Sequence, residues 1–290
     1  MDPVLNKLQV SEFFRYATER YSIYQKRMNG YPKPWTTDSI LQQYRFCNVF
    51  REDDKVTMWF RSNVRTPMRA NPRVCMATLV FRFVNSIGTG QHLLEAGVFR
   101  HYESAKFAAA MKQIKDAGKP MLGAAYMIKT PNGKNKITGL QEIFEPFAAM
   151  GDSMAEHIKK RATMKALVDF LTDFPYVGGF MAYEIACDLQ YTDWFKPSDT
   201  MSWANPGPGA RRGLQRLVTE TGVRSNTSLS TNQMLSMMQE LLTEAYSVRN
   251  WPGHWRMWDM RTVEHTLCEF DKYKRAQLGE GKPKQKFEGR

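Results

Sequence analysis

The sequence is poor in cysteine and lacks short motifs that define several common enzyme classes. Its four cysteines, Cys47, Cys75, Cys187 and Cys268, show no C-x-x-C spacing and lie among apolar residues. Neither a zinc site nor a disulfide framework is therefore predicted, no metal ligand is assigned, and we interpret the cysteines as reduced core residues. A G-x-x-x-x-G-K-[ST] motif is also missing, which argues against P-loop kinase or NTPase chemistry.

Long apolar runs are missing as well. The sequence contains no stretch of about 18 consecutive apolar residues and no charged-then-apolar leader, so neither membrane insertion nor export is expected. Hydrophobic residues make up 42% of the 290 positions, which is enough to bury the core of one large domain or two small ones.

What the chain does have is an excess of positive charge. Its 41 Lys and Arg residues against 29 Asp and Glu residues give a formal net charge of +12, and the pI is near 9.5. This balance favours a polyanionic partner such as nucleic acid, although a basic surface that only keeps the protein soluble is the alternative.

Apolar spacing predicts a mainly α protein. Helical periodicity covers residues 8–29, 104–117 and 140–170, and the only strands expected form a small β-hairpin within residues 121–140. Gly88 and Gly90 precede a helix expected to start at about residue 91, and we interpret them as a turn with weak potential for phosphate binding.

The stretch at residues 171–214 is the most informative part of the chain. Its hexapeptide FPYVGG, residues 174–179, lies between two runs of helical period, so a helix is predicted to start at Gly179 after a tight turn. The exposed amides at such a helix start attract a phosphate, which makes Gly178 and Gly179 candidate DNA-binding residues, flanked by Lys160 and Lys165. An ordinary helical hairpin is the alternative.

A second informative stretch follows the helix-capping residue Asp38. One helix is predicted from there to residues 53–55, with Arg45, Asn48 and Glu52 on one face. We interpret this face as a pocket wall, in which Asn48 reads the edge of a base and Arg45 and Arg51 bind phosphate or carboxylate groups. A solvated face with local ion pairs to Glu52 or Asp54 is the alternative.

A third stretch, NPGPGARRG at residues 205–213, combines a rigid loop with two arginines. The following helix is predicted to offer its first amides, with Gly207, Gly209, Arg211 and Arg212 forming a cradle for phosphate or pyrophosphate. A linker followed by a basic helix is the alternative.

The chain closes with a helix and a basic tail. Val263, Leu267 and Phe270 are expected to pack inward, and another face of the same helix carries Glu264, Cys268 and Asp271. Residues 276–290 are low in apolar residues and are expected to form a flexible tail.

These stretches occur in an order that resembles the bacteriophage α-glutamyl/putrescinyl-thymine pyrophosphorylase family. The resemblance rests on residues 30–60, on FPYVGGFMAYEIACDLQYTD, on PGPGARRGL and on HTLCEFDKY, and it spans about residues 13–273. It implies a helix-hairpin-helix fold similar to DNA glycosylases, as one domain of residues 1–275 with two lobes and the hairpin at 164–190 in the second. That family also resembles the helical domain of hydroxymethyluracil DNA kinases, although no P-loop motif of such a kinase occurs in this sequence.

The resemblance further implies a transferase acting on double-stranded phage DNA in the cytoplasm of the infected bacterial host. Pyrophosphorylated 5-hydroxymethyluracil, flipped out of the duplex, would lose pyrophosphate and gain a free amino acid or polyamine, with glycine the first choice and glutamate or putrescine behind it. No cofactor is expected to be required, with Mg²⁺ or a monovalent cation at the hairpin left open.

Several residues take roles in this chemistry. A carboxylate must accept the proton of the incoming amine, and the candidates are Asp199, Asp53, Asp54 and Glu269. Asp199 follows the hairpin in the manner of the glycosylase aspartate, and Glu269 and Lys272 are expected to bind substrate or pyrophosphate. The alternatives are a DNA glycosylase and a non-catalytic DNA-binding protein. Phe180 argues against a bifunctional glycosylase because it stands where such enzymes carry a lysine.

Overall fold

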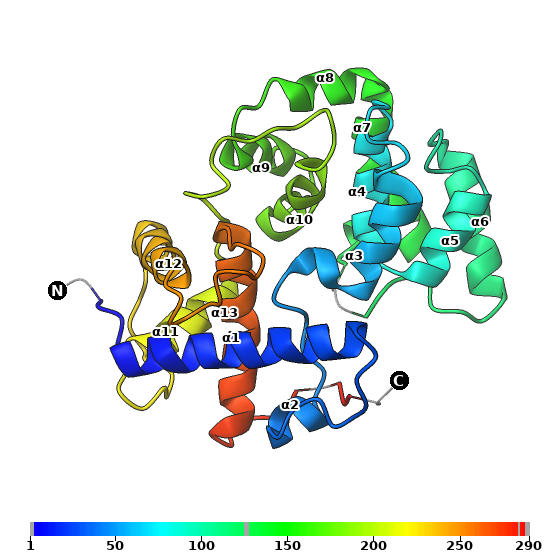
Figure 1. Ribbon diagram of the computed structural model, residues 1–290. Helices are drawn as coiled ribbons and strands as arrows, with labels where there is room; N and C mark the ends of the chain where they lie inside the picture. Colours follow the sequence, from blue (N-terminus) through cyan, green and yellow to red (C-terminus); the bar gives the residue numbers. More distant parts are fainter. Residues whose placement is uncertain (1–2, 125–127, 284, 288–290) are drawn as a thin grey trace. The chain divides into compact units, whose positions relative to one another are not determined.

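The computed structural model describes residues 3–124, 128–283 and 285–287, and these residues are mainly helical (Figure 1). Within these ranges there is no β-strand, and the one isolated bridge pairs Tyr44 with Lys286. The predicted mainly α fold is confirmed. No described helix is both long enough and apolar enough to cross a membrane.

The predicted β-hairpin within residues 121–140 is wrong. Residues 125–127 lie outside the described residues, but Pro131–Gly133 form a 3-10 turn and α7 (Lys136–Met150) begins soon after it. The side chain of Asn135 accepts hydrogen bonds from the backbone N–H groups of Ile137 and Thr138. This N-cap stabilises a helix start where a second strand was expected.

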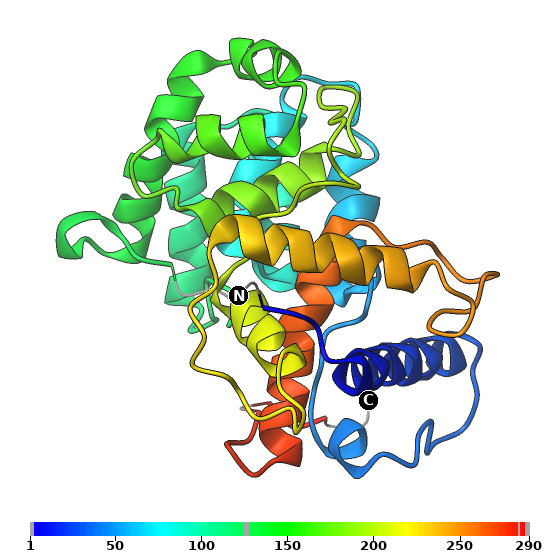
Figure 2. The ribbon, with the colours of Figure 1, turned by 90° about the vertical axis from the view of Figure 1, so that its left-hand side faces the viewer.

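The chain divides into two compact units, one made of Met1–Asp54 with Thr200–Arg290 and the other of Lys55–Asp199. In the first unit α13 contacts the other helices, and Figure 2 shows α1, α11 and α12 around it. The predicted first helix, residues 8–29, is confirmed. The helices of this unit are α1 (Lys7–Met28), α2 (Ser39–Gln43), α11 (Pro208–Leu217), α12 (Thr231–Ala245) and α13 (Met260–Gln277).

Helix α13 is buried on more than the one face that the sequence predicts. Its residues Val263, Leu267 and Phe270 are fully buried, as expected, but Asp271 is also 0% exposed. The carboxylate of Asp271 accepts hydrogen bonds from Arg212 Nε at 2.9 Å and Arg216 Nε at 2.7 Å. With Arg275, whose Nε lies 3.4 Å from Asp271 Oδ2, three guanidinium groups therefore neutralise a charge that is otherwise costly to bury.

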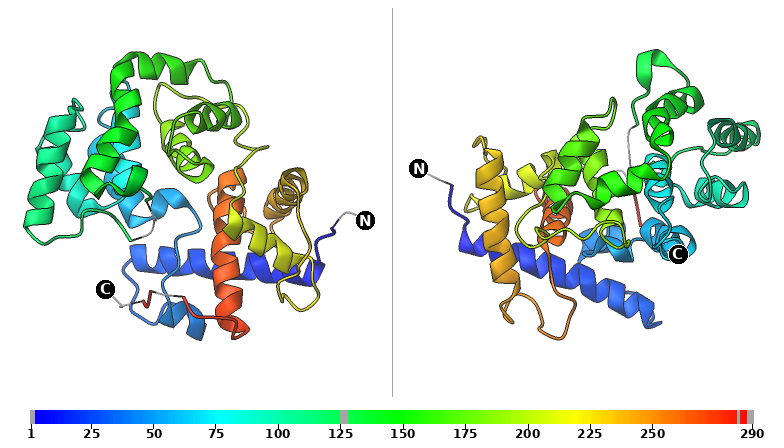
Figure 3. Two further views of the ribbon diagram at one scale, coloured as in Figure 1. Left: turned by 180° about the vertical axis from the view of Figure 1, so that it is seen from behind. Right: turned by 90° about the horizontal axis from the view of Figure 1, so that it is seen from above.

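The second unit is built around α4, whose eleven residues are all buried. It contacts α5, α7, α8 and α10, and α5 and α6 lie side by side (Figure 3). The predicted helix at 104–117 and the predicted helix start at Gly179 are confirmed. The further helices are α3 (Lys55–Phe60), which continues into a π-helical turn at Arg61–Arg65, α4 (Val74–Val84), α5 (Ile87–Glu95), α6 (Ser104–Asp116), α8 (Ser153–Lys159), α9 (Met164–Thr172) and α10 (Gly179–Leu189).

Helix α5 begins earlier than expected, at Ile87 with Ser86 as its N-cap, so Gly88 and Gly90 lie inside the helix. A Cβ atom added to Gly90 would lie 2.6 Å from the Trp59 ring and 2.8 Å from the Phe81 ring. This glycine therefore permits close packing of α5, and the turn predicted here is not formed.

A buried ionic cluster ties the helices of the second unit together. Asp188 of α10 is 0% exposed and accepts hydrogen bonds from Arg65 Nη1 at 2.6 Å and from Arg82 Nη2 at 3.0 Å. Arg82 also donates to Asn85 and to Thr57 of α3. One carboxylate thus joins the π-helical turn, α4 and α10.

Replacing Asp188 by alanine should destabilise the protein by about 3–5 kcal/mol, because two buried guanidinium groups lose their counter-charge. The matched control is Asp169→Ala, which removes the partner of Lys165 from a pair whose side chains are more than half exposed and should cost less than about 1 kcal/mol. Urea unfolding of both variants at neutral pH gives the comparison. Equal losses would contradict a dominant role for the buried cluster.

Candidate functional site

The segment that follows α2 is extended, so the single helix predicted from Asp38 to residues 53–55 is wrong. Helix α2 ends at Gln43, and the next helical turn is the short 3-10 segment Arg51–Asp53. Arg45, Asn48 and Glu52 therefore do not share a helix face. The physical reason lies in the backbone amides of this segment, which find partners outside any local helix.

Three contacts hold the extended segment. The N–H of Arg45 donates to the carbonyl of Gln285 at 3.0 Å. The N–H of Cys47 donates to Glu269 Oε2, and the N–H of Asn48 donates to Asp54 Oδ1, both at 2.9 Å. Two carboxylates and one distant carbonyl thus take the place of the helical carbonyls as acceptors.

The first of these contacts also concerns the end of the chain. Residues 285–287 pair with residues 43–45, and the ring of Phe287 contacts that of Trp35 at a centroid distance of 6.1 Å. This part of the predicted flexible tail is therefore attached to the first unit.

Asn48 braces the extended segment with both ends of its amide. Its Oδ1 accepts a hydrogen bond from Arg20 Nη2 at 2.5 Å, and its Nδ2 donates to the carbonyl of Asp53 at 2.6 Å. These bonds occupy much of the amide's capacity, so the structure gives Asn48 a bracing role. Its reading of a base edge stays a prediction.

The two arginines predicted beside Asn48 differ in exposure. Arg45 is exposed, whereas Arg51 is 8% exposed and lies close enough to Asp54 to favour its charged form. Their roles in holding phosphate or carboxylate groups stay predictions.

Glu269 and Lys272, predicted to bind substrate, pair with each other on α13. Glu269 Oε2 accepts from Lys272 Nζ at 2.8 Å as well as from the N–H of Cys47. Burial raises the pKa of Glu269, but Lys272, His265 and these hydrogen bonds more than offset it, so the pKa is lowered overall. Glu269 is therefore a carboxylate held in its charged form.

Asp54 also lies beside α13, but its pKa is shifted in the opposite direction from that of Glu269. Burial raises its pKa to about 6, with Glu269 adding to the rise, although the N–H of Asn48 and the charge of Arg20 oppose it. Its Oδ2 lies 3.8 Å from His265 Nε2. Asp54 can therefore gain or lose a proton close to neutral pH.

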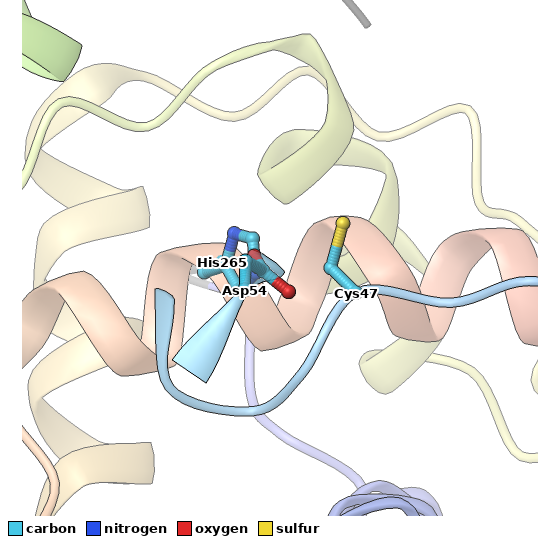
Figure 4. Close-up of side chains that lie close together, drawn as sticks. All are labelled: Cys47, Asp54 and His265. Carbon is cyan, nitrogen blue, oxygen red and sulfur yellow. The ribbon is translucent and has the colours of Figure 1, made fainter. Parts of the chain in front are cut away.

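Cys47 completes a group that the sequence analysis misses. The Cys47 Sγ, an Asp54 carboxylate oxygen and a His265 ring nitrogen all lie within 4.8 Å of one another (Figure 4). Cys47 is half-buried among charged groups, so its assignment to an apolar core is wrong. The available signal was the spacing of His265 and Glu269, four residues apart on one face of α13.

The glycines of the predicted pyrophosphate cradle serve helix packing. Helix α11 starts at Pro208 with Gly207 as its N-cap. A Cβ atom added to Gly209 would lie 2.7 Å from Cys268 Sγ, and one added to Gly213 would lie 2.5 Å from the carbonyl oxygen of Leu267. The two glycines, one helical turn apart, let α11 approach α13 closely.

The arginines of the same stretch have different surroundings. Arg212 donates to the buried Asp271, whereas Arg211 is exposed. Arg212 is therefore part of the structural cluster on Asp271. Pyrophosphate binding by Gly207, Gly209, Arg211 and Arg212 stays a prediction.

In the second unit, α9 and α10 form the predicted helical pair, and Gly178 is the N-cap of α10. The turn places Tyr176 in the left-handed region, with φ of +65°, whereas the turn was expected to depend on its glycines. A Cβ atom added to Gly178 would meet nothing within 4 Å. Lys160 is exposed, and Lys165 pairs with Asp169 at 2.6 Å.

Asp199 belongs to the second unit, and Asn48 and Asp54 belong to the first. The Asp199 carboxylate accepts hydrogen bonds from the N–H groups of Met164 at 2.6 Å and Lys165 at 3.2 Å. These are the first amides of α9, so Asp199 anchors the start of the helical pair. Its role as a catalytic carboxylate stays a prediction.

The comparison with known proteins identifies the family of this helical chain. Residues 8–283 match the family described as "5-hmdU DNA kinase, helical domain", and the chain belongs to this family. A relative named "5-hmdU DNA kinase", from Bacillus phage SP10, is 25% identical over 294 residues that cover 94% of this chain and 46% of the relative. The chain therefore spans about half the length of this curated relative.

These matches support the predicted relationship to phage proteins of thymine hypermodification. No solved structure matches the chain. The likeness to helix-hairpin-helix DNA glycosylases stays a prediction.

Gly213→Ala should destabilise the protein by about 1–3 kcal/mol, because the new methyl group overlaps a backbone carbonyl of α13. Gly88→Ala is the control, since this glycine is also helical but a Cβ atom there meets nothing within 4 Å. The control should stabilise by up to about 1 kcal/mol through helix propensity. Thermal melts of the two variants test the contrast, and stabilisation by both would remove the packing role of Gly213.

Compared with the parent protein, the Asp54→Asn variant should become more stable as the pH rises. The folded-state pKa of about 6 lies above the ordinary 3.8, so stability linked to protonated Asp54 is present below pH 3.8 and lost as the pH passes 6. The free-energy difference between variant and parent should grow by up to roughly 3 kcal/mol from pH 4 to 8. Denaturant unfolding is measured with EDTA present and with His265→Gln in both proteins, so that only the titration of Asp54 differs between them. A free-energy difference that does not change with pH would contradict the raised pKa of Asp54.

Proposed function

We propose that this chain transfers an amine to an activated 5-hydroxymethyluracil base in phage DNA and releases pyrophosphate. Two findings support this proposal. The family and the phage relative carry 5-hmdU DNA in their names. The observation that carries the chemistry is the acid–base cluster of the first unit, where Asp54, Glu269 and Lys272 surround one extended segment.

The reaction makes two demands on the protein. The C–O bond between the methylene on C5 and the pyrophosphate breaks, and its electron pair leaves with the pyrophosphate. The amine lone pair forms the new C–N bond, and the amine proton must pass to a base. Cations near the leaving group and a carboxylate near the nucleophile therefore both lower the barrier.

The first unit offers groups for both demands. Asp54 titrates close to neutral pH, and Glu269 is held in its charged form, so either carboxylate can accept the proton of an incoming ammonium group. Arg20 and Lys272 lie in the same cluster and provide positive charge. We propose Glu269, which is held in its charged form, as the base, with Asp54 as the alternative.

We assign DNA binding to the basic surface and to the helical pair of the second unit. The N-terminus of α10 follows Gly178, and Lys160 and Lys165 lie on the surface of the same unit. Amides and ammonium groups of this kind bind phosphates of either strand without reading sequence. The target base would be flipped from the duplex to reach the reacting groups.

For the amine we propose an amino acid, with glycine first and glutamate or putrescine behind it. An arginine such as the exposed Arg45 would bind the amino-acid carboxylate through its forked donors. We propose that the reaction takes place on double-stranded DNA in the cytoplasm of the infected bacterial host.

Incubating the protein with DNA that contains pyrophosphorylated 5-hydroxymethyluracil should produce a new nucleoside in which one amine replaces pyrophosphate. Glycine, glutamate and putrescine are supplied separately, and digested nucleosides are identified by mass spectrometry. DNA with unmodified 5-hydroxymethyluracil is the control and should remain unchanged. Release of a free base would favour a glycosylase instead, and an unchanged substrate with every amine would contradict the transferase.

The role of the cluster is tested by Glu269→Gln, which keeps the size of the side chain and removes its charge. Single-turnover transfer should slow by at least about tenfold with little change in DNA affinity. Asp169→Asn, at an exposed carboxylate of the second unit, should keep the parental rate. Equal rates for both variants would remove Glu269 from the mechanism.

A further inference from the structure

Three potential metal ligands converge in the first unit from two distant parts of the sequence. Cys47 and Asp54 lie at either end of the extended segment and its 3-10 turn, and His265 lies on α13 (Figure 4). Their ligand atoms lie within 4.8 Å of one another. A sulfur, a nitrogen and an oxygen therefore lie close together.

The surrounding hydrogen bonds fix these ligands in position. Asp54 Oδ1 accepts the N–H of Asn48, so Oδ2 is the oxygen that lies 3.8 Å from His265 Nε2. Glu269 Oε2 accepts the N–H of Cys47 and holds that end of the segment against α13. Such outer contacts orient ligands in known metal sites, where their loss weakens binding.

The spacing suits a tetrahedral ion. Metal–ligand bonds of about 2.0–2.3 Å place the ligand atoms of a tetrahedral site about 3.3–3.8 Å apart. The His265 to Asp54 distance of 3.8 Å lies at the upper end of this range, and Cys47 Sγ lies within 4.8 Å of both ligand atoms. Three protein ligands leave the fourth position open, as in catalytic zinc sites.

The ligand types select a class of ion. Thiolate and imidazole ligands favour zinc and similar transition metals, whereas Mg²⁺ prefers an environment of oxygen atoms only. The side chains of His265 and Asp54 are 14% and 25% exposed, and His265 Nε2 itself is buried.

We propose that Cys47, Asp54 and His265 bind one divalent transition-metal ion of the zinc type, with one coordination position open. This site differs in place and in ligand chemistry from a Mg²⁺ or monovalent ion at the helical pair. It does not depend on the proposed transferase function. If that function holds, the open position suits a pyrophosphate oxygen, and Glu269 is the carboxylate left to accept the amine proton.

Metal binding is measured on the full chain after chelator treatment and exchange into metal-free buffer. Zn²⁺ should bind at one ion per chain, as determined by calorimetry and elemental analysis, and millimolar Mg²⁺ should not displace it. Co²⁺ as a probe should give a sulfur-to-cobalt charge-transfer band together with visible bands of tetrahedral intensity. Folded protein that binds no stoichiometric Zn²⁺, or loses it to Mg²⁺, would overturn the proposal.

Ligand assignment is tested with matched cysteine variants. Cys47→Ser should abolish the charge-transfer band and weaken Zn²⁺ binding by at least tenfold. Cys268→Ser, at the other half-buried cysteine of this unit, should leave both unchanged. His265→Gln provides a second loss of affinity should Cys47→Ser fail to fold, as judged by circular dichroism. Retention of the band in Cys47→Ser, or full affinity in His265→Gln, would contradict the assignment.

Discussion

Each unit depends on one buried aspartate that pairs with several arginines. Asp188 pairs with Arg65 and Arg82 in the second unit, and Asp271 pairs with Arg212, Arg216 and Arg275 in the first. The carboxylate and its charged donors lose hydration together, so their positions must match for the unit to be stable. Directional contacts of this kind determine which faces of the helices meet. Apolar packing alone would tolerate several such arrangements.

The cluster on Asp271 also fixes the candidate site. Since α13 is a continuous helix, holding Asp271 against α11 determines where His265 and Glu269 lie on the same helix. Gly209 and Gly213 allow the close approach that this pairing requires. The extended segment is then attached through its amides to Glu269 and Asp54. Helix α13 therefore carries both the structural residue Asp271 and the candidate-site residues His265 and Glu269. A substitution that moves Asp271 will also displace His265 and Glu269.

The sequence predicts what depends on neighbouring residues and misses what depends on distant ones. The first helix and the start of α10 follow from periodicity and from the glycine turn, and the structure has both. The helix predicted through Asn48 fails because Glu269, 222 positions from Cys47, supplies the competing acceptor. Asp54, Glu269 and Lys272 are predicted from the family resemblance and from the carboxylate and cations that its chemistry requires. The spacing of His265 and Glu269 places both on one face of a helix, but nothing local shows that the thiol of Cys47 will meet this imidazole.

The buried charged residues also determine where the net positive charge of the protein lies. Among the described residues, the buried charged side chains comprise five cations and five anions: Arg51, Arg65, Arg82, Arg216 and Lys274, with Glu52, Glu184, Asp188, Glu264 and Asp271. Their charges cancel, so the formal excess of +12 belongs to residues that are not buried. If the arginines had been buried without matching anions, less positive charge would remain at the surface for a polyanionic partner. Here the core is neutral as a whole, and the positive charge is available at the surface to a phosphate backbone.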